Sequence, residues 1–251
     1  MKRPIVIAFG LVMFAASTKA QPKVKSQAER DAFAAIENEK NPDRRIQEAD
    51  DFVSAFKDSE LKSIVLDLAA GAEELKGNTE QAISYAQKAL SANQWDYQAM
   101  LLISGELARQ TRDRDPDKAE KLGRAEKFAH DAIGIIERSL NPDPKDIGEA
   151  RWAALKKDLI AQAHEDLGLV ALVRGQADLA VAEFKVAVDQ AATPDPGTMV
   201  RLAAAYDQAG KPENALAVLE KVLAMSNLNE AIRQFAENEH KRAQLKSRRQ
   251  E

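Results

Sequence analysis

Apolar residues spaced four and then three positions after an alanine recur along most of this chain, and this pattern constrains the fold more than any other feature. It occurs as five runs: Ala49-Val53-Phe56, Ala82-Ala86-Ala89, Ala125-Ala129-Ala132, Ala180-Phe184-Ala187 and Ala215-Leu219-Val222. Steps of four and three place the side chains of a run on one face of an α-helix. The sequence therefore predicts five helices that each pack a face of small and apolar side chains against a neighbour.

The distances along the chain between the runs indicate repeated units. The leading alanines are separated by 33, 43, 55 and 35 residues, and two of these intervals match the roughly 34-residue period of a helix–turn–helix repeat. The interval of 43 residues includes the charged stretch 111–122, which predicts a longer loop between helices. The interval of 55 includes residues 146–174, where apolar side chains step by three or four. We expect one extended helix there, about 44 Å long.

Residues 161–229 carry the most specific motif. Its two copies read Leu167, Gly168, Gly175, Ala180, Phe184 and Ala187, and then Leu202, Ala203, Tyr206, Gly210, Ala215 and Leu219. In each copy a small residue, Gly168 or Ala203, lies where a partner helix crosses, and a later glycine ends the first helix. This order of residues resembles the tetratricopeptide repeat (TPR) family, in the bacterial secreted or periplasmic type, and the resemblance extends over most of residues 27–229.

The resemblance implies an all-α fold, a TPR-like α-solenoid of about five helix–turn–helix repeats with one extended helix and a C-terminal capping helix. The repeats are expected at approximately 27–61, 62–95, 96–140, 141–195 and 196–229. Residues 230–251 are expected to form the capping helix and a charged tail, in which the apolar residues close the core: Ile232, Phe235, Ala236 and Leu245. We interpret the basic residues of this segment as solvated cations near a helix C-terminus in preference to a site for an anionic partner.

The first twenty residues have the features of a secretory signal peptide. Lys2 and Arg3 precede an apolar stretch from Pro4 to Ala16, and small residues then lead to an expected cleavage site after Ala20. The apolar stretch is short for a membrane span, which favours cleavage over retention as an anchor. We therefore expect residues 21–26 to form a short linker, and the mature protein to be periplasmic or secreted without a membrane span.

The composition argues against several classes of function. The chain has no cysteine, which excludes disulfides, thiolate metal sites and thiol catalysis. Its net charge of −4 does not suit a nucleic-acid-binding surface. None of the three histidines, His130, His164 and His240, has a second ligand at a recognised metal spacing. We predict no catalytic residue, no cofactor and no resident metal.

One acidic stretch, residues 113–117, has part of the pattern of an ion-binding loop. Asp113, Asp115 and Asp117 alternate like the start of a calcium loop. A calcium loop of this kind needs a glycine at its sixth place and a glutamate at its twelfth, where this chain has Lys118 and Arg124. A solvated acidic loop is therefore favoured over a weak ion site.

The resemblance to TPR arrays also implies a mode of binding, in which a concave groove lined by the first helix of each repeat receives a partner. It assigns this role to ten residues, which are Gln98, Leu101, Gly105, Arg109, Glu165, Leu169, Leu172, Val200, Ala204 and Asp207. This set is largely apolar or small, which suits a helix or an extended hydrophobic segment of a protein partner.

The function expected from these observations is a non-enzymatic interaction scaffold or adaptor of the bacterial cell envelope. A periplasmic holdase or a solute-binding protein is the alternative, and an enzyme with a site built across repeats is less favoured. A homo-oligomer formed through the extended helix is a further expectation.

Overall fold

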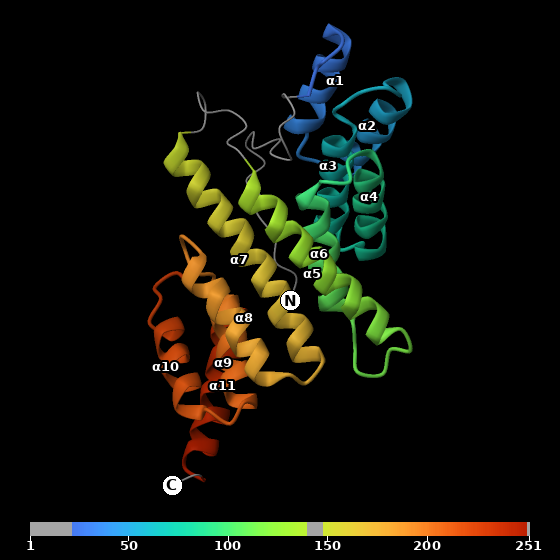
Figure 1. Cartoon of the computed structure of the whole chain (residues 1–251). Coiled ribbons are helices and arrows are strands. Elements are labelled where there is room, and N and C mark those ends of the chain that lie inside the picture. The colour runs from blue at the N-terminus through green and yellow to red at the C-terminus, as the bar shows by residue number, and fades with distance from the viewer. Residues whose placement is uncertain (1–21, 140–147, 250–251) are drawn as a thin grey trace. The chain divides into compact units, whose positions relative to one another are not determined.

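The computed structural model describes residues 22–139 and 148–249, and the regular secondary structure within these residues is entirely α-helical (Figure 1). The predicted signal segment 1–20 and part of the predicted junction between repeats, residues 140–147, lie outside the described residues. The helices are α1 (Gln27–Asn38), α2 (Pro42–Ala55), α3 (Lys62–Lys76), α4 (Thr79–Ala92), α5 (Tyr97–Gln110), α6 (Lys118–Arg138), α7 (Glu149–Val173), α8 (Ala177–Gln190), α9 (Pro196–Gln208), α10 (Pro212–Leu223) and α11 (Glu230–Ser247). The predicted all-α class is confirmed.

Polar caps and prolines fix where several helices begin. The Asn41 side chain accepts a hydrogen bond from the Arg44 backbone N–H at 3.1 Å, and Pro42 is the first residue of α2. The Asp195 side chain caps α9 in the same way, again directly before a proline. The cap satisfies an N–H that has no partner inside the helix, and proline lacks the N–H that would be left unpaired.

Four of the five alanine-led runs form buried stripes as predicted, in α4, α6, α8 and α10. In α2 the prediction is partly wrong, because the structure buries Ala49 and Phe52 while Val53 and Phe56 are only partly buried. Phe52 follows Ala49 by three positions and not by four, so the buried face is rotated relative to the other runs.

The predicted loop at 111–122 is shorter than expected. Thr111 to Asp117 connect the two helices, and α6 already begins at Lys118. Leu122 and Ala125 are both buried and lie three positions apart, so the apolar face of α6 extends into residues assigned to the loop.

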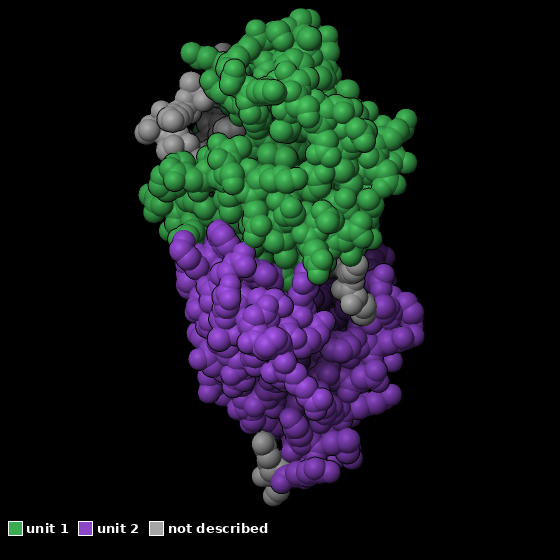
Figure 2. Space-filling model, turned by 90° about the vertical axis from the view of Figure 1, so that its right-hand side faces the viewer, with its two compact units in different colours: residues 1–106, 131–149 green, residues 107–130, 150–251 purple. Residues whose placement is uncertain are grey.

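The chain divides into two compact units (Figure 2). Unit 1 comprises residues 1–106 and 131–149, and unit 2 comprises residues 107–130 and 150–251. The division falls within α5, within α6 and directly after Glu149, the first residue of α7, so α5 and α6 each contribute one end to each unit.

In unit 1, α3 packs against α1, α2 and α4, and it is buried around most of its circumference. Its alanines Ala69, Ala70 and Ala72 have no exposed surface. Such small side chains let the neighbouring helices approach α3 closely from several sides. α4 is further tied to α2 by the Tyr85 hydroxyl, which donates a hydrogen bond of 2.9 Å to Asp50.

In unit 2, the expected extended helix is present as α7, which has 25 residues, with bounds a few residues inside those predicted. α7 and α9 are followed by Gly175 and Gly210, whose φ angles are 75° and 72°. This left-handed conformation is strained for residues with a Cβ, so glycine at these places allows each chain reversal.

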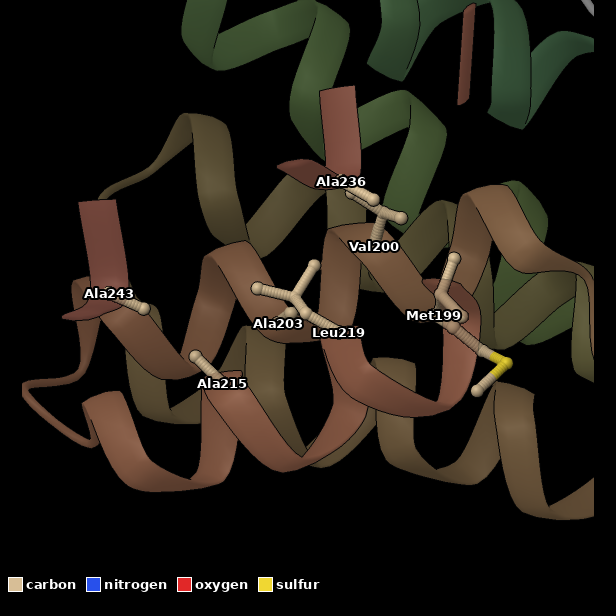
Figure 3. Close-up of a cluster of buried hydrophobic side chains, with 8 residues drawn as sticks. Met199, Val200, Ala203, Ala215, Leu219, Ala236 and Ala243 are labelled. Atoms are coloured by element: carbon tan, nitrogen blue, oxygen red, sulfur yellow. The ribbon is translucent and has the colours of Figure 1, made fainter. Parts of the chain in front are cut away.

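The C-terminal end of unit 2 is built on small side chains (Figure 3). α10 packs against both α9 and α11, and α11 also packs against α9. In this cluster Ala236 lies beside Val200, and Ala243 lies toward the end of the cluster that contains Ala215. The small side chains leave room for the three helices to approach one another closely.

One expectation for α11 is wrong. Phe235 and Leu245, which the sequence pattern placed in the core, are 49% and 58% exposed. The residues that α11 buries are Ala236, Glu239 and Ala243. These are spaced three and four apart, so they form an inward face of their own that is rotated away from the two large apolar residues.

Candidate partner-binding surface

The structure divides the ten predicted groove residues into two equal groups. The partly exposed group contains Gln98, Arg109, Leu169, Leu172 and Ala204, and the buried group contains Leu101, Gly105, Glu165, Val200 and Asp207. Leu101 and Val200 are each only 2% exposed, so the expectation that these two side chains line an open surface is wrong. Val200 belongs to the cluster that α11 closes with Ala236.

The buried Glu165 on α7 binds two residues of α9. One of its carboxylate oxygens accepts a hydrogen bond of 2.7 Å from the Thr198 hydroxyl, and the other lies 2.8 Å from the Arg201 guanidinium. A buried carboxylate is stable in a protein when it is both paired and hydrogen-bonded. Glu165 therefore joins the first helices of two consecutive helix pairs.

The buried Asp207 on α9 makes the corresponding connection to α11. Its Oδ2 accepts from the Arg242 Nε at 2.9 Å and from the Lys246 Nζ at 2.7 Å. Lys246 also donates to the Asp207 backbone carbonyl at 3.2 Å. Two of the basic residues near the C-terminus thus neutralise a carboxylate within the same chain, a role that neither interpretation of the sequence included.

Apolar side chains of α7 and α9 stay partly exposed beside these ion pairs. Leu169 and Leu172 follow Glu165 by four and seven positions, and Ala204 follows Arg201 by three. These spacings place each of them on the same helical face as the charged residue that it follows. The paired charges and the partly exposed apolar groups therefore share one side of the first helices.

Phe235 and Leu245 extend this surface onto α11. They lie seven positions before and three positions after Arg242, which places all three on one face of the helix. Because Arg242 reaches Asp207 of α9, this face adjoins α9. We call the set of Leu169, Leu172, Ala204, Phe235 and Leu245 the first-helix surface. In the sequence, Ala236 and Ala243 lie seven positions apart and form a separate stripe of small residues on α11. This stripe could have indicated that Phe235 and Leu245 face outward.

Comparison with known proteins identifies the fold. Residues 196–227, which include α9 and α10, match the family model of the tetratricopeptide repeat. The structure also resembles a thermophilic TPR protein from Thermus thermophilus, with a TM-score of 0.55 and 18% identity, over 85% of this chain and 95% of that one. The chain has a TPR-like fold. The predicted TPR-like α-solenoid class is thereby confirmed.

A second structural match is to a chain of the APC/C hetero-tetramer Cut9–Hcn1. The TM-score is 0.58 at 17% identity, and the match covers 84% of this chain but 35% of the other. No curated protein matches this chain in sequence. At these identities the similarity concerns the fold alone.

The other candidate residues from the sequence make contacts within the helices and loops of the chain. Asp113 and Asp117 each lie 3.0 Å from a lysine, Lys118 and Lys121 respectively. His164 on α7 lies 2.7 Å from Glu183 on α8 and so connects the two helices of one repeat. The described residues contain no group of three or more side chains placed to hold a metal ion. They also contain no helix long and apolar enough to cross a membrane.

Proposed function

We propose that this protein is a non-enzymatic interaction scaffold or adaptor of the bacterial cell envelope, which binds an apolar segment of a protein partner on the first-helix surface of unit 2. The observation that carries the proposal is the exposure of Phe235 and Leu245 beside first helices whose buried charges are already paired. Large apolar side chains that share one exposed helical face are a feature of binding surfaces. The TPR-like fold supports a protein as the ligand.

The chemistry of this surface favours an apolar partner segment over a charged one. Glu165 and Asp207 are neutralised by cations of the same chain, so a partner need not supply countercharges for them. Removing apolar surface from water is favourable by about 25 cal/mol of free energy for each Å² buried. The amphipathic face of a helix, or an extended hydrophobic segment, supplies such surface. The partly exposed Arg242 can orient a polar edge of the partner.

The location in the cell envelope rests on the features of residues 1–20. The measurement is N-terminal sequencing of the protein purified from fractionated native cells. A mature chain beginning at Gln21 in the periplasmic or secreted fraction supports the proposal. An intact Met1 in the cytoplasmic fraction contradicts the envelope role and leaves the interaction surface in place.

The binding surface is tested by mild crosslinking in the native host, followed by purification of the tagged protein and mass spectrometry. The test variants are Phe235→Ser and Leu245→Ser. The matched control is Leu179→Ser, which removes an apolar side chain that is 44% exposed on the second helix α8. All three positions are exposed, so melting curves close to that of the wild type are expected and serve as the folding control.

Partner proteins recovered at fixed ratio with the wild type and the control, but lost with the two α11 variants, support the scaffold function. Equal recovery from all variants contradicts binding on this surface. Recovery of many unfolded proteins, with melting shifts in the presence of apolar dyes, assigns a holdase function instead. Formation of a homo-oligomer through the long helix α7 stays a separate prediction. It is tested by measuring the molar mass with light scattering after size-exclusion chromatography.

A further inference from the structure

Three basic residues near the end of α11 surround one large apolar side chain of the first-helix surface. Lys241 lies four positions before Leu245. Arg248 and Arg249 lie three and four positions after it, where the helix ends. Residues at these spacings are neighbours on the surface of a helix. All four residues are exposed, and 58% of the surface of Leu245 is accessible. At this end the surface therefore combines an apolar group with positive charge.

We call Lys241, Arg248 and Arg249 the α11 cations. Within residues 22–139 and 148–249 they form no ion pair. The two other basic residues of this part of α11 are engaged inside the chain. Arg242 lies 2.9 Å from Asp207 and 2.8 Å from Glu239, and Lys246 lies 2.7 Å from the same aspartate. The α11 cations are thus the part of the basic segment whose charge the fold does not use.

Two exposed carboxylates lie in this part of unit 2, but both are placed away from Leu245. Glu237 lies eight positions before it, which is about 12 Å along the helix and beyond the Debye length of about 10 Å at moderate salt. Glu213 of α10 accepts a hydrogen bond of 3.0 Å from Ser247. Ser247 follows Leu245 by two positions and so lies on another side of α11.

Charge is distributed differently over the rest of the first-helix surface. Glu165 on α7 is paired with Arg201 of α9 at 2.8 Å. Asp207 on α9 is paired with two basic residues of α11. The exposed residues that lie three or four positions from Phe235 are uncharged. The positive charge that the fold leaves unpaired on α11 is therefore concentrated at the Leu245 end of this surface.

The helix dipole alone does not explain this arrangement. It attracts cations to the C-terminus of a helix, which is the interpretation that the sequence favours, and it accounts for the positions of the α11 cations. It does not account for Leu245, whose exposure to water among them is unfavourable until another molecule covers it. In a chain whose net charge is −4, the α11 cations are also a local excess of positive charge.

We propose that the partner segment carries acidic residues at the end that covers Leu245, where they pair with the α11 cations, and apolar residues along the rest of its length. This assignment rests on the proposed function, because it gives the chemistry of the segment that the first-helix surface binds. Ion pairs at the rim of an interface add modestly to affinity and are screened by salt. Apolar contacts are not screened, so the two contributions can be separated.

The experiment uses three labelled helical peptides that share one apolar face and differ only at one end, which carries glutamates, glutamines or lysines. Fluorescence anisotropy with the full chain measures the Kd of each peptide at low and at high salt. At low salt we expect the glutamate peptide to bind about fivefold more tightly than the glutamine peptide, and the lysine peptide to bind most weakly. At about 1 M salt the three values should converge.

The test variant replaces all three α11 cations by glutamine, and we expect it to bind the three peptides equally at low salt. The matched control is the triple variant Arg30→Gln, Lys40→Gln and Lys57→Gln, which makes the same change in net charge at exposed residues of unit 1. It should keep the preference of the wild type for the glutamate peptide. All six positions are exposed, and melting curves check that both variants fold.

The possible outcomes separate this inference from the proposed function. Equal binding of the glutamate and lysine peptides by the wild type overturns the acidic end and leaves binding of an apolar segment in place. Failure of all three peptides to bind contradicts the proposed function and the inference together. Binding of the wild type to vesicles of anionic phospholipid, but to none of the peptides, assigns the α11 cations to a lipid surface and also overturns the inference.

Discussion

The helix pairs α7–α8 and α9–α10 have different residues at the place where their two helices cross. In α7–α8 the small residue at the crossing is Gly168, and a Cβ added to it would lie 2.7 Å from two ring carbons of the buried Phe184. In α9–α10 the equivalent residues are Ala203 and Leu219, which are buried in one cluster. The larger aromatic ring accompanies glycine, and the smaller leucine accompanies alanine. Close packing therefore specifies the combined volume of the pair rather than either residue alone.

The largest effect is expected from Gly168→Ala. The new methyl group cannot be accommodated without moving Phe184, which overpacks the core, and we expect a loss of roughly 2–3 kcal/mol in the free energy of unfolding. This net value already includes the gain of about 1 kcal/mol that alanine brings to a helix interior. Urea denaturation measures the difference.

The control for this prediction is the double variant Gly168→Ala with Phe184→Leu, which copies the combination of α9–α10. We expect the double variant to recover part of the loss, because the leucine leaves room for the methyl group. A single Gly168→Ala variant as stable as the wild type would show that the volume of the pair is not constrained, and would remove the basis of the comparison.

The next largest effect is expected from the ion pairs of the buried carboxylates Glu165 and Asp207. Replacing both Arg242 and Lys246 by methionine leaves Asp207 buried without a cation, and because both cations are partly exposed we expect a loss of about 2 kcal/mol in the free energy of unfolding. Arg201→Met leaves Glu165 with its hydrogen bond from Thr198, so we expect a smaller loss of about 1 kcal/mol. Chemical denaturation at low ionic strength distinguishes the two.

Asp207→Asn is the informative counterpart to these cation variants. It leaves two partly exposed cations that water can solvate, so its cost should be smaller than that of the double methionine variant. A larger cost for Asp207→Asn would mean that the connection stabilises the fold by attraction across the pair and not by relieving a buried charge.

The smallest effect is expected where the two helix pairs are alike. Gly175→Ala and Gly210→Ala each place a Cβ on a residue in the left-handed conformation, but the Cβ meets no atom within 4 Å. The cost is then backbone strain alone, about 1 kcal/mol in each case. Thermal melting should show equal shifts for the two variants. Unequal shifts would indicate that the two turns are not equivalent.

The candidate site could be predicted from the sequence only in part. Leu169, Leu172 and Ala204 are partly exposed on the first helices of unit 2, but Val200 was assigned to an open groove and is covered by α11. A periodic pattern reveals that a face is apolar. It does not reveal whether that face contacts a later helix of the same chain or a separate partner.

The sequence by itself determined the helical class, the extended helix, four of the five buried stripes and the glycines that end α7 and α9, because each of these depends on residues within a few turns of one another. Only the tertiary structure decided that Phe235 and Leu245 face outward. It also decided that Glu165 binds Arg201 on the next first helix and that Asp207 binds Arg242. These contacts join residues 36 and 35 positions apart. Their geometry depends on how whole helices pack, which local periodicity does not encode.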